Sequence, residues 1–277
     1  MTNIFNGGQE IQNLDAFLQD WFNKKEIVNK ELKEAMLYSL FTGGKRIRPL
    51  LFYTLAEDLQ VKTEANVYFA AALECIHTYS LIHDDLPAMD NDDYRRGKLT
   101  CHKKFGEAIG ILAGDGLLNE SVELALKGIE ALPIERKNSG IMAASFLFRA
   151  SGNSGMIDGQ AMDMEEGSAS RDIILYKKKT GALLGAALSM AASLSTADKA
   201  IAEIFYSIGE ILGVSYQLQD DRFDTIEDGV ETDKEHLLQL EKDSIEYTEK
   251  VFKELDKLNL NLSNLIELIQ KILDRKE

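Results

Sequence analysis

The stretch VYFAAALECIHTYSLIHDD, residues 67–85, decides the fold class of this chain. It predicts a long apolar helix from Val67 to Ile82 that runs into an acidic pair, Asp84 and Asp85. The whole chain has 277 residues and only three prolines, and so few helix-breaking residues favour helices over a turn-rich β fold. Segments with strand-like alternation are hard to find. The sequence therefore predicts an all-α protein.

Apolar residues recur at helical spacing along almost the whole chain. Three short periodic segments come first, and the longer predicted helices follow at 67–82, 105–129, 136–152, 154–166, 171–194, 198–220, 235–255 and 263–274. The predicted breaks fall at 42–44, 87–97, 131–133, 167–168 and 228–229. No Ser/Gly/Pro-rich linker divides the chain and no fixed-period repeat is evident. We expect one domain over residues 1–277, a bundle of about ten helices.

Composition narrows the class of protein. The net charge of −15 argues against a nucleic-acid binder, which needs a basic face. Two cysteines, Cys75 and Cys101, form neither a disulfide framework nor a zinc spacing, so free thiols are expected. No signal peptide is visible, and the apolar stretch from Gly181 to Leu194 is too short to span a bilayer. These features predict a cytoplasmic protein without a membrane span.

The first acidic cluster comprises Asp84, Asp85 and Asp90 and follows the apolar helix. Asp84 and Asp90 would point apart on an ideal helix, but Pro87 interrupts the helix between them, and a local bulge would bring them together. Clustered carboxylates that keep waters and bridge to phosphate are the ligands that Mg²⁺ prefers. The alternative interpretation is a solvated acidic loop. An EF-hand is a poor alternative, because its central Gly and terminal Glu are missing.

The second acidic cluster comprises Asp220, Asp221 and Asp224, at the end of the predicted helix 198–220. Asp220 and Asp224 are four residues apart and share one helix face. Like charges so placed repel, and an acidic helix end lies at the unfavourable pole of the macrodipole, so a cation is expected there. Two such clusters after apolar helices are less probable by chance than one.

Basic residues must offset the negative charge if the ligand is a phosphate ester. Lys45, Arg46 and Arg48 follow two glycines that allow close backbone approach. Further basic groups are the pair at 95–96, beside the first acidic cluster, and the lysines at 177–179. Solvated surface charge is the alternative for each group, and it is weakest for the pair at 95–96. His77 and His83 on the apolar helix fit either core residues or neighbours of a site.

Taken together, these motifs resemble those of the trans-isoprenyl diphosphate synthases, in particular the bacterial farnesyl type. The resemblance covers about residues 10–225. The matching segments are GGKRIRP at 43–49, ECIHTYSLIHDDLPAMD at 74–90, RRG at 95–97, TCH at 100–102, GQAMD at 159–163, KTG at 179–181 and YQLQDD at 216–221. It implies a helical bundle around a central cavity, the isoprenoid synthase fold, and a homodimer.

The resemblance also implies an activity and residue roles. The activity is condensation of isopentenyl diphosphate with dimethylallyl or geranyl diphosphate to farnesyl diphosphate. Three Mg²⁺ ions on the allylic diphosphate would be held by Asp84, Asp85, Asp90, Asp220, Asp221 and Asp224. The implied allylic diphosphate ligands are Arg95, Lys179, Gln217 and Lys234, and the isopentenyl diphosphate ligands are Lys45, Arg48, His77 and Arg96. Thr180 is a further implied substrate-binding residue. The implied catalytic set is Asp84, Asp85, Asp90, Arg95, Lys179 and Asp220.

Product length depends on residues just before the first acidic cluster. Ser80 lies one turn, about 6 Å, below Asp84 on the same helix face, and Tyr79 is its neighbour. A ring there would form the floor of the pocket that receives the growing chain. In the family an aromatic residue at this place, with the Pro87-Ala88 insertion, goes with a fifteen-carbon product.

The chain departs from the family pattern near the second cluster. Arg222 and Phe223 stand where two aliphatic residues are usual, and Arg222 either points outward or pairs with an Asp. Lys234 lacks its usual Gly neighbour, and the Gly-rich loop that normally follows is missing, with Lys242 as a second candidate cation.

Three alternatives stay open. The first two are a different product, either geranyl or geranylgeranyl diphosphate. The third is that the chain is a non-catalytic subunit that partners an active one. A terpene cyclase is disfavoured, because it needs no second diphosphate site.

Overall fold

A computed structural model describes residues 8–165, 173–196, 198–227 and 234–274. The chain separates into two compact units. Unit 1 contains Met1–Tyr53 and Thr63–Lys137, and unit 2 contains Thr54–Lys62 and Asn138–Glu277. The single domain over 1–277 therefore stays a prediction.

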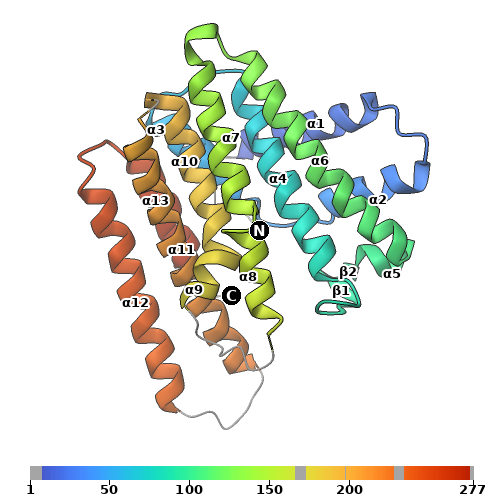
Figure 1. The fold of residues 1–277 in the computed structure, drawn as a ribbon. Coiled ribbons are helices and arrows are strands. Elements are labelled where there is room, and N and C mark those ends of the chain that lie inside the picture. The colour runs from blue at the N-terminus through green and yellow to red at the C-terminus, as the bar shows by residue number, and fades with distance from the viewer. Residues whose placement is uncertain (1–7, 166–172, 197, 228–233, 275–277) are drawn as a thin grey trace. The chain divides into compact units, whose positions relative to one another are not determined.

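The all-α prediction is confirmed: among the described residues, eleven helices have eight residues or more (Figure 1). The first half of the chain has α1 (Gly8–Lys24), α2 (Lys30–Leu40), α3 (Ile47–Asp58), α4 (Ala65–Asp84), β1 (Tyr94–Arg95), β2 (Lys98–Leu99), α5 (Cys101–Phe105), α6 (Glu107–Ala131) and a 3₁₀ turn at Ile134–Arg136. The second has α7 (Lys137–Ser151), α8 (Met156–Asp163), α9 (Ile173–Tyr176), a π turn at Lys177–Gly181, α10 (Ala182–Thr196), α11 (Lys199–Glu227), α12 (Lys234–Asp256) and α13 (Ser263–Leu273).

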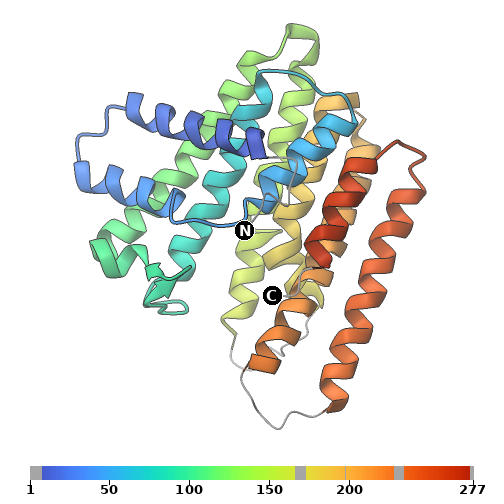
Figure 2. The ribbon, with the colours of Figure 1, turned by 180° about the vertical axis from the view of Figure 1, so that it is seen from behind.

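In unit 1, α4 and α6 lie side by side along most of their lengths (Figures 1 and 2). Twelve of the twenty residues of α4 are buried, because the helix is apolar nearly all round. Glycines on α6 make room for rings on α4: Gly128 faces Phe69, and Gly114 faces the imidazole of His83. This packing fixes the end of α4 that carries the first acidic cluster.

The antiparallel hairpin of β1 and β2 was not predicted from the sequence. Its turn residues Arg96 and Gly97 have φ angles of 54° and 73°, which is the pattern of a two-residue type I′ turn. The turn lies just beyond the acidic end of α4 in unit 1 (Figure 1). It determines where the two arginines at 95–96 lie.

In unit 2, α10 and α11 pack so closely that glycines face each other. A Cβ on Gly213 would meet the backbone of Gly181, and one on Gly209 would meet the backbone of Gly185. The apolar stretch from Gly181 to Leu194 thus belongs to a buried, closely packed helix. The predicted helix 171–194 is interrupted by the π turn, and π turns often occur at functional sites.

The second acidic cluster lies inside a helix rather than at its end, because α11 continues past Asp220 to Glu227. The helix α12 packs along α11 and covers a small core of Leu175, Tyr176, Val214, Leu218 and Leu240. The predicted breaks at 167–168 and 228–229 lie outside the described residues.

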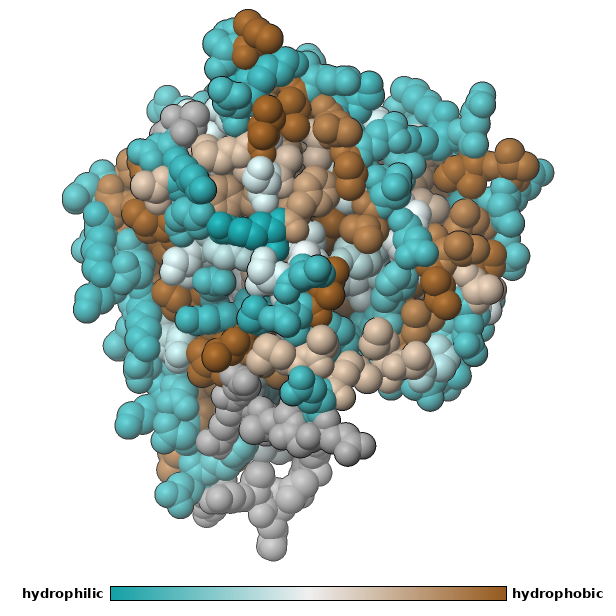
Figure 3. All heavy atoms as spheres, viewed as in Figure 1, coloured by the Kyte–Doolittle hydropathy of each residue, from teal (hydrophilic) through white to brown (hydrophobic). Residues whose placement is uncertain are grey.

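No helix within the described residues has the length and apolar character needed to cross a membrane. The face shown in Figure 3 is mostly hydrophilic, with smaller hydrophobic patches between.

Candidate active site

The first acidic cluster begins where α4 ends and the chain turns back on itself. The backbone N–H of Asp90 donates to the carbonyl oxygen of Asp84 at 3.0 Å. The turn therefore closes over the five residues between them, and this is the local bulge that Pro87 predicted. Asp84 is half-buried and Asp90 is exposed, so the cluster opens toward solvent on one side.

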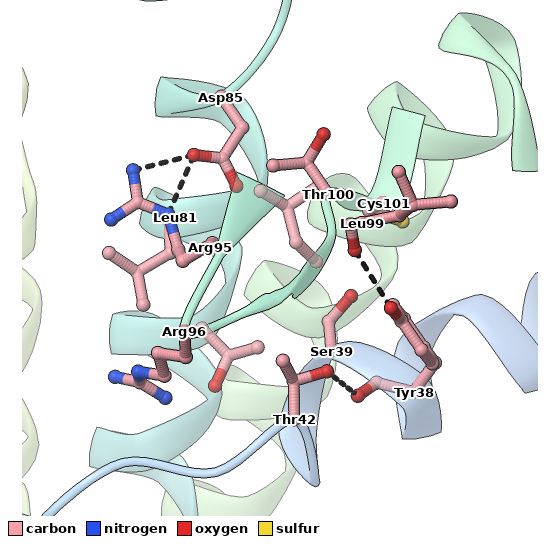
Figure 4. Close-up of a pocket in the computed structure, with 12 residues that line it drawn as sticks. Tyr38, Ser39, Thr42, Leu81, Asp85, Arg95, Arg96, Leu99, Thr100 and Cys101 are labelled. Atoms are coloured by element: carbon pink, nitrogen blue, oxygen red, sulfur yellow. Dashed lines mark hydrogen bonds and ion pairs between the residues drawn. The ribbon is translucent and has the colours of Figure 1, made fainter. Parts of the chain in front are cut away.

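Asp85 is the buried member of this cluster, with 3% of its surface exposed. Arg95 donates through Nε at 2.6 Å and pairs through Nη2 at 2.5 Å, both to Oδ1 of Asp85 (Figure 4). Burial raises the pKa of Asp85, and the Arg95 cation opposes that shift. Asp85 also raises the pKa of Arg95 against the effect of burial, so Arg95 stays a cation beside the acidic cluster.

Arg96, the next residue, reaches a different part of unit 1. Its Nη1 donates to the carbonyl oxygen of Gly43, and its guanidinium lies where a Cβ on Gly44 would stand. Gly43 and Gly44 have φ angles of 109° and 119°, which glycine adopts at least cost. The hairpin thus directs one arginine to the acidic cluster and the other to the basic loop at 43–48.

Within that basic loop, Arg46 is committed to the core. Its Nη1 lies 2.5 Å from Glu74 and its Nη2 2.9 Å from Asp15, and 8% of the side chain is exposed. Nη2 also donates to the carbonyl oxygen of Leu40 at 2.7 Å. Arg46 has a φ of 49°, and such backbone strain persists where surrounding contacts enforce it. Burial in this ion-pair network identifies Arg46 as a structural cation that anchors the loop.

The other cations of the loop are placed differently. Lys45 is exposed, and Nη1 of Arg48 lies 3.2 Å from Nε2 of His77 on α4. Burial lowers the pKa of His77 well below its usual value, and the cations of Arg48 and Arg96 lower it further. A neutral imidazole can accept from Arg48. The structure therefore brings the four predicted isopentenyl diphosphate ligands to one region of unit 1.

A cavity of about 30 Å³ lies behind the hairpin (Figure 4). Its lining includes Ser39, Thr78, Asp85, Arg95 and Arg96. The cavity is therefore lined by Asp85 of the first acidic cluster and by both arginines of the hairpin.

The two predicted chain-length residues lie on α4 in unit 1. The Tyr79 ring is 6% exposed and packs edge-on against His83, with ring centroids 5.8 Å apart. Its hydroxyl is buried and has no hydrogen-bond partner among the described residues, and burial raises the pKa of Tyr79 to about 12. Ser80 donates to the carbonyl oxygen of His77 at 2.9 Å. Tyr79 is thus a bulky, buried ring near the acidic end of α4.

In unit 2, the π turn carries the predicted ligands Lys179 and Thr180. Nζ of Lys179 lies 2.5 Å from Oδ2 of Asp163 at the end of α8, which stands in the matching GQAMD segment. Gly159 allows the backbone of the turn to pass close to α8, because a Cβ there would meet the backbone at 178–179.

The second acidic cluster is tied to this turn by hydrogen bonds. Thr180 Oγ1 donates to Oε1 of Gln217 at 3.2 Å, and Nε2 of Gln217 donates to Oδ1 of Asp221 at 3.0 Å. The hydroxyl of Tyr176, a residue that sequence reasoning missed, donates to Oδ2 of Asp221. Asp220 is half-buried and Asp224 is exposed on the same helix.

Arg222 points away from the cluster. Its Nη2 lies 3.7 Å from Oε1 of Glu241 on α12. The substitution that departs from the family pattern therefore pairs outward within unit 2. Lys234 begins α12, and its side chain lies outside the described residues.

The donor chemistry of both clusters fits Mg²⁺. Each cluster offers hard carboxylate oxygens, and Mg²⁺ typically takes one or two of these and completes its octahedron with water and substrate phosphates. In the described part of the chain, no three His, Cys, Asp or Glu side chains already converge on one point. Such a set is unnecessary when diphosphate oxygens supply the remaining ligands.

Comparison with known proteins gives a consistent result. The family model described as polyprenyl synthetase matches residues 29–249. A farnesyl diphosphate synthase of Micrococcus luteus is 39% identical, covering 92% of this chain and 94% of that protein. The farnesyl diphosphate synthase of Escherichia coli is 43% identical over 72% of this chain and 68% of its own length. A geranyltransferase structure from Legionella pneumophila superposes with a TM-score of 0.83 at 34% identity, covering 96% and 95% of the two chains.

Proposed function

Because this chain belongs to the polyprenyl synthetase family, we propose that it is a Mg²⁺-dependent prenyltransferase that makes farnesyl diphosphate. It would condense isopentenyl diphosphate with dimethylallyl or geranyl diphosphate. The observation that carries the proposal is the pair of consecutive arginines, Arg95 on Asp85 and Arg96 on Gly43. Two diphosphate substrates need two anion sites, and the hairpin would give each one an arginine.

We propose for the individual residues the roles that the family resemblance implies. In unit 1, Asp84, Asp85 and Asp90 would hold Mg²⁺, with Arg95 as the neighbouring cation for the allylic diphosphate. Lys45, Arg48, His77 and Arg96 would bind isopentenyl diphosphate. In unit 2, Asp220, Asp221 and Asp224 would complete a set of three Mg²⁺ ions, and Lys179, Thr180, Gln217 and Lys234 would assist the allylic diphosphate.

Bound Mg²⁺ would neutralise the leaving diphosphate, so that the allylic C–O bond ionises. Arg95, a cation held by Asp85, adds charge stabilisation as the diphosphate departs. Arg48 and Arg96 hold the second substrate so that its double bond attacks the allylic cation. A proton then leaves to the departing diphosphate, and no side-chain nucleophile is needed. The buried Tyr79 ring would exclude water and limit product length.

The direct test is to incubate the purified chain with Mg²⁺, isopentenyl diphosphate and either dimethylallyl or geranyl diphosphate. The expected product has fifteen carbons, measured by chromatography after dephosphorylation. A ten- or twenty-carbon main product would correct the chain length. Absence of any product while both substrates bind would favour a non-catalytic subunit.

A matched pair of variants tests the division of labour between the arginines. We expect Arg95→Ala to raise KM mainly for the allylic diphosphate, and Arg96→Ala to raise KM mainly for isopentenyl diphosphate, each by about tenfold or more. Equal effects of each variant on both substrates would contradict the assignment of one arginine to each site.

We further propose a homodimer in the cytoplasm. Support for the dimer comes from α6, where Ile111, Leu112, Val122 and Leu126 are 46%, 51%, 41% and 55% exposed and recur along the helix. Both cysteines are buried and free, which suits a reducing compartment. Sedimentation of the wild-type chain and of Leu126→Glu would test the dimer, with a shift to monomer expected for the variant.

A further inference from the structure

Tyr176 reaches the second acidic cluster from outside its own helix. It is the last residue of α9, just before the π turn, and its hydroxyl donates to Oδ2 of Asp221, 45 residues later. Asp221 accepts at its other oxygen from Gln217. Both oxygens of this carboxylate are therefore held by protein donors.

The direction of the hydrogen bonds follows from the chemistry of Asp221. An ionised carboxylate only accepts, so Gln217 must turn its NH₂ group toward Asp221 and its carbonyl toward Thr180. Thr180 must then donate its hydroxyl proton. In this series of hydrogen bonds, from Thr180 through Gln217 to Asp221, each donor points toward Asp221. Such an arrangement fixes an anion in one orientation.

Packing holds Tyr176 in place. Its ring is 6% exposed and belongs to the small core with Leu175, Val214, Leu218 and Leu240. The ring is thus fixed by apolar neighbours from α9, α11 and α12, and the hydroxyl has a defined position at the cluster. A tyrosine whose role was packing alone would not need its hydroxyl directed at a carboxylate.

We propose that Tyr176 is a positioning residue that orients Asp221 for Mg²⁺ and diphosphate. This proposal rests on the proposed function and deepens it. Each carboxylate oxygen offers about two lone-pair directions, so one hydrogen bond on each oxygen leaves the second direction for a metal ion or its bound water. With Tyr176 and Gln217 on the two oxygens, rotation of the carboxylate is restrained, and its remaining lone pairs keep one preferred direction.

The test uses Tyr176→Phe in the full chain, which keeps the ring and removes only the hydroxyl. The matched control is Tyr247→Phe, because Tyr247 on α12 packs against the same small core. Calorimetric titration with Mg²⁺ in the presence of inorganic diphosphate measures binding without turnover. We expect Tyr176→Phe to weaken the Mg²⁺-dependent binding by about tenfold. Tyr247→Phe should bind like wild type, and the thermal midpoints of both variants without Mg²⁺ should stay close to that of wild type.

A double-mutant cycle separates positioning from a direct contact. If Tyr176 acts through Asp221, then Tyr176→Phe should add almost nothing to the loss caused by Asp221→Asn. The Mg²⁺ concentration for half-maximal activity should rise in the same pattern. Two results would overturn the role of Tyr176 and leave the proposed function standing. One is that Tyr176→Phe binds Mg²⁺ as tightly as wild type, and the other is that the losses of Mg²⁺ binding are additive in the double variant. A wild-type chain that binds no Mg²⁺ with diphosphate would overturn both.

Discussion

The guanidinium of Arg96 occupies the space that a side chain on Gly44 would need. Its Nη1 donates to the carbonyl oxygen of Gly43, so the turn of the hairpin and the basic loop are fastened together in unit 1. Gly44 is therefore required twice, for its φ of 119° and for the room it leaves to Arg96.

Gly44→Ala should displace Arg96 and raise KM for isopentenyl diphosphate by about tenfold or more. Gly43→Ala is the matched control, because Gly43 also has a positive φ, 109°, but nothing lies within 4 Å of a Cβ built there. Both variants share the backbone strain, and only Gly44→Ala adds the collision. Steady-state kinetics with each substrate varied in turn would measure the difference, and equal KM values in the two variants would contradict it.

Tyr79→Ala should lengthen the products, because in the proposed function the ring forms the floor of the pocket that receives the growing chain. It should also lower the free energy of unfolding by about 3–5 kcal/mol, the usual cost of truncating a buried aromatic ring. Tyr79→Phe should keep the product length and the stability, since the lost hydroxyl has no hydrogen-bond partner among the described residues. Product chromatography and denaturant unfolding test both parts, and an unchanged product spectrum in Tyr79→Ala would refute the chain-length role.

The pKa of His77 is lowered by burial and then by the cations of Arg48, Arg96, Arg46 and Arg95. Below about pH 6.5, the usual pKa in the unfolded chain, the unfolded state binds the proton and the folded state does not. The free energy of unfolding should therefore decrease as the pH is lowered below about 6.5. This group contributes at most about 1.4 kcal/mol for each pH unit. His77→Gln should lose that part of the slope between pH 7.5 and 5.5. Parallel pH profiles of the two chains would count against the buried neutral imidazole.

Arg222→Leu should leave Mg²⁺ activation unchanged, because Arg222 pairs with Glu241 rather than with an Asp of the cluster. The pair is partly exposed, at 35% and 49% of the side chains, so its loss should cost under about 1 kcal/mol of stability. Asp224→Asn, two residues on, is the contrasting variant and should raise the Mg²⁺ requirement. A strong Mg²⁺ effect of Arg222→Leu would show that the departure at this position alters the metal site.

Long apolar helices were predictable, because burial on most sides gives a continuous signal, and α4, α6 and α7 begin and end within two residues of expectation. The hairpin was not, since strands of two residues carry no alternation to detect. The only local signal was Arg96-Gly97, a two-residue turn with glycine second. The π turn also escaped, because one extra residue barely shifts a helical period.

The sequence predicted which residue types would form the candidate site, but it did not predict which residue each of them contacts. Arg46 and Arg48 look alike in sequence, but the ion pairs with Glu74 and Asp15 that bury Arg46 join residues about thirty positions apart. The bond from Tyr176 to Asp221 is equally invisible to local pattern, and so is the outward turn of Arg222, which depends on Glu241 of the next helix.

The facing glycines of α10 and α11 have a mechanical consequence. At Gly181–Gly213 and Gly185–Gly209 the backbones are in direct contact, and neither contact leaves room for a Cβ. The π turn that carries Lys179 and the helix α11 that carries Asp221 should therefore move together as one rigid unit. The backbone spacing between the turn and the helix that carries the second acidic cluster is thus set by glycine contacts rather than by side-chain packing.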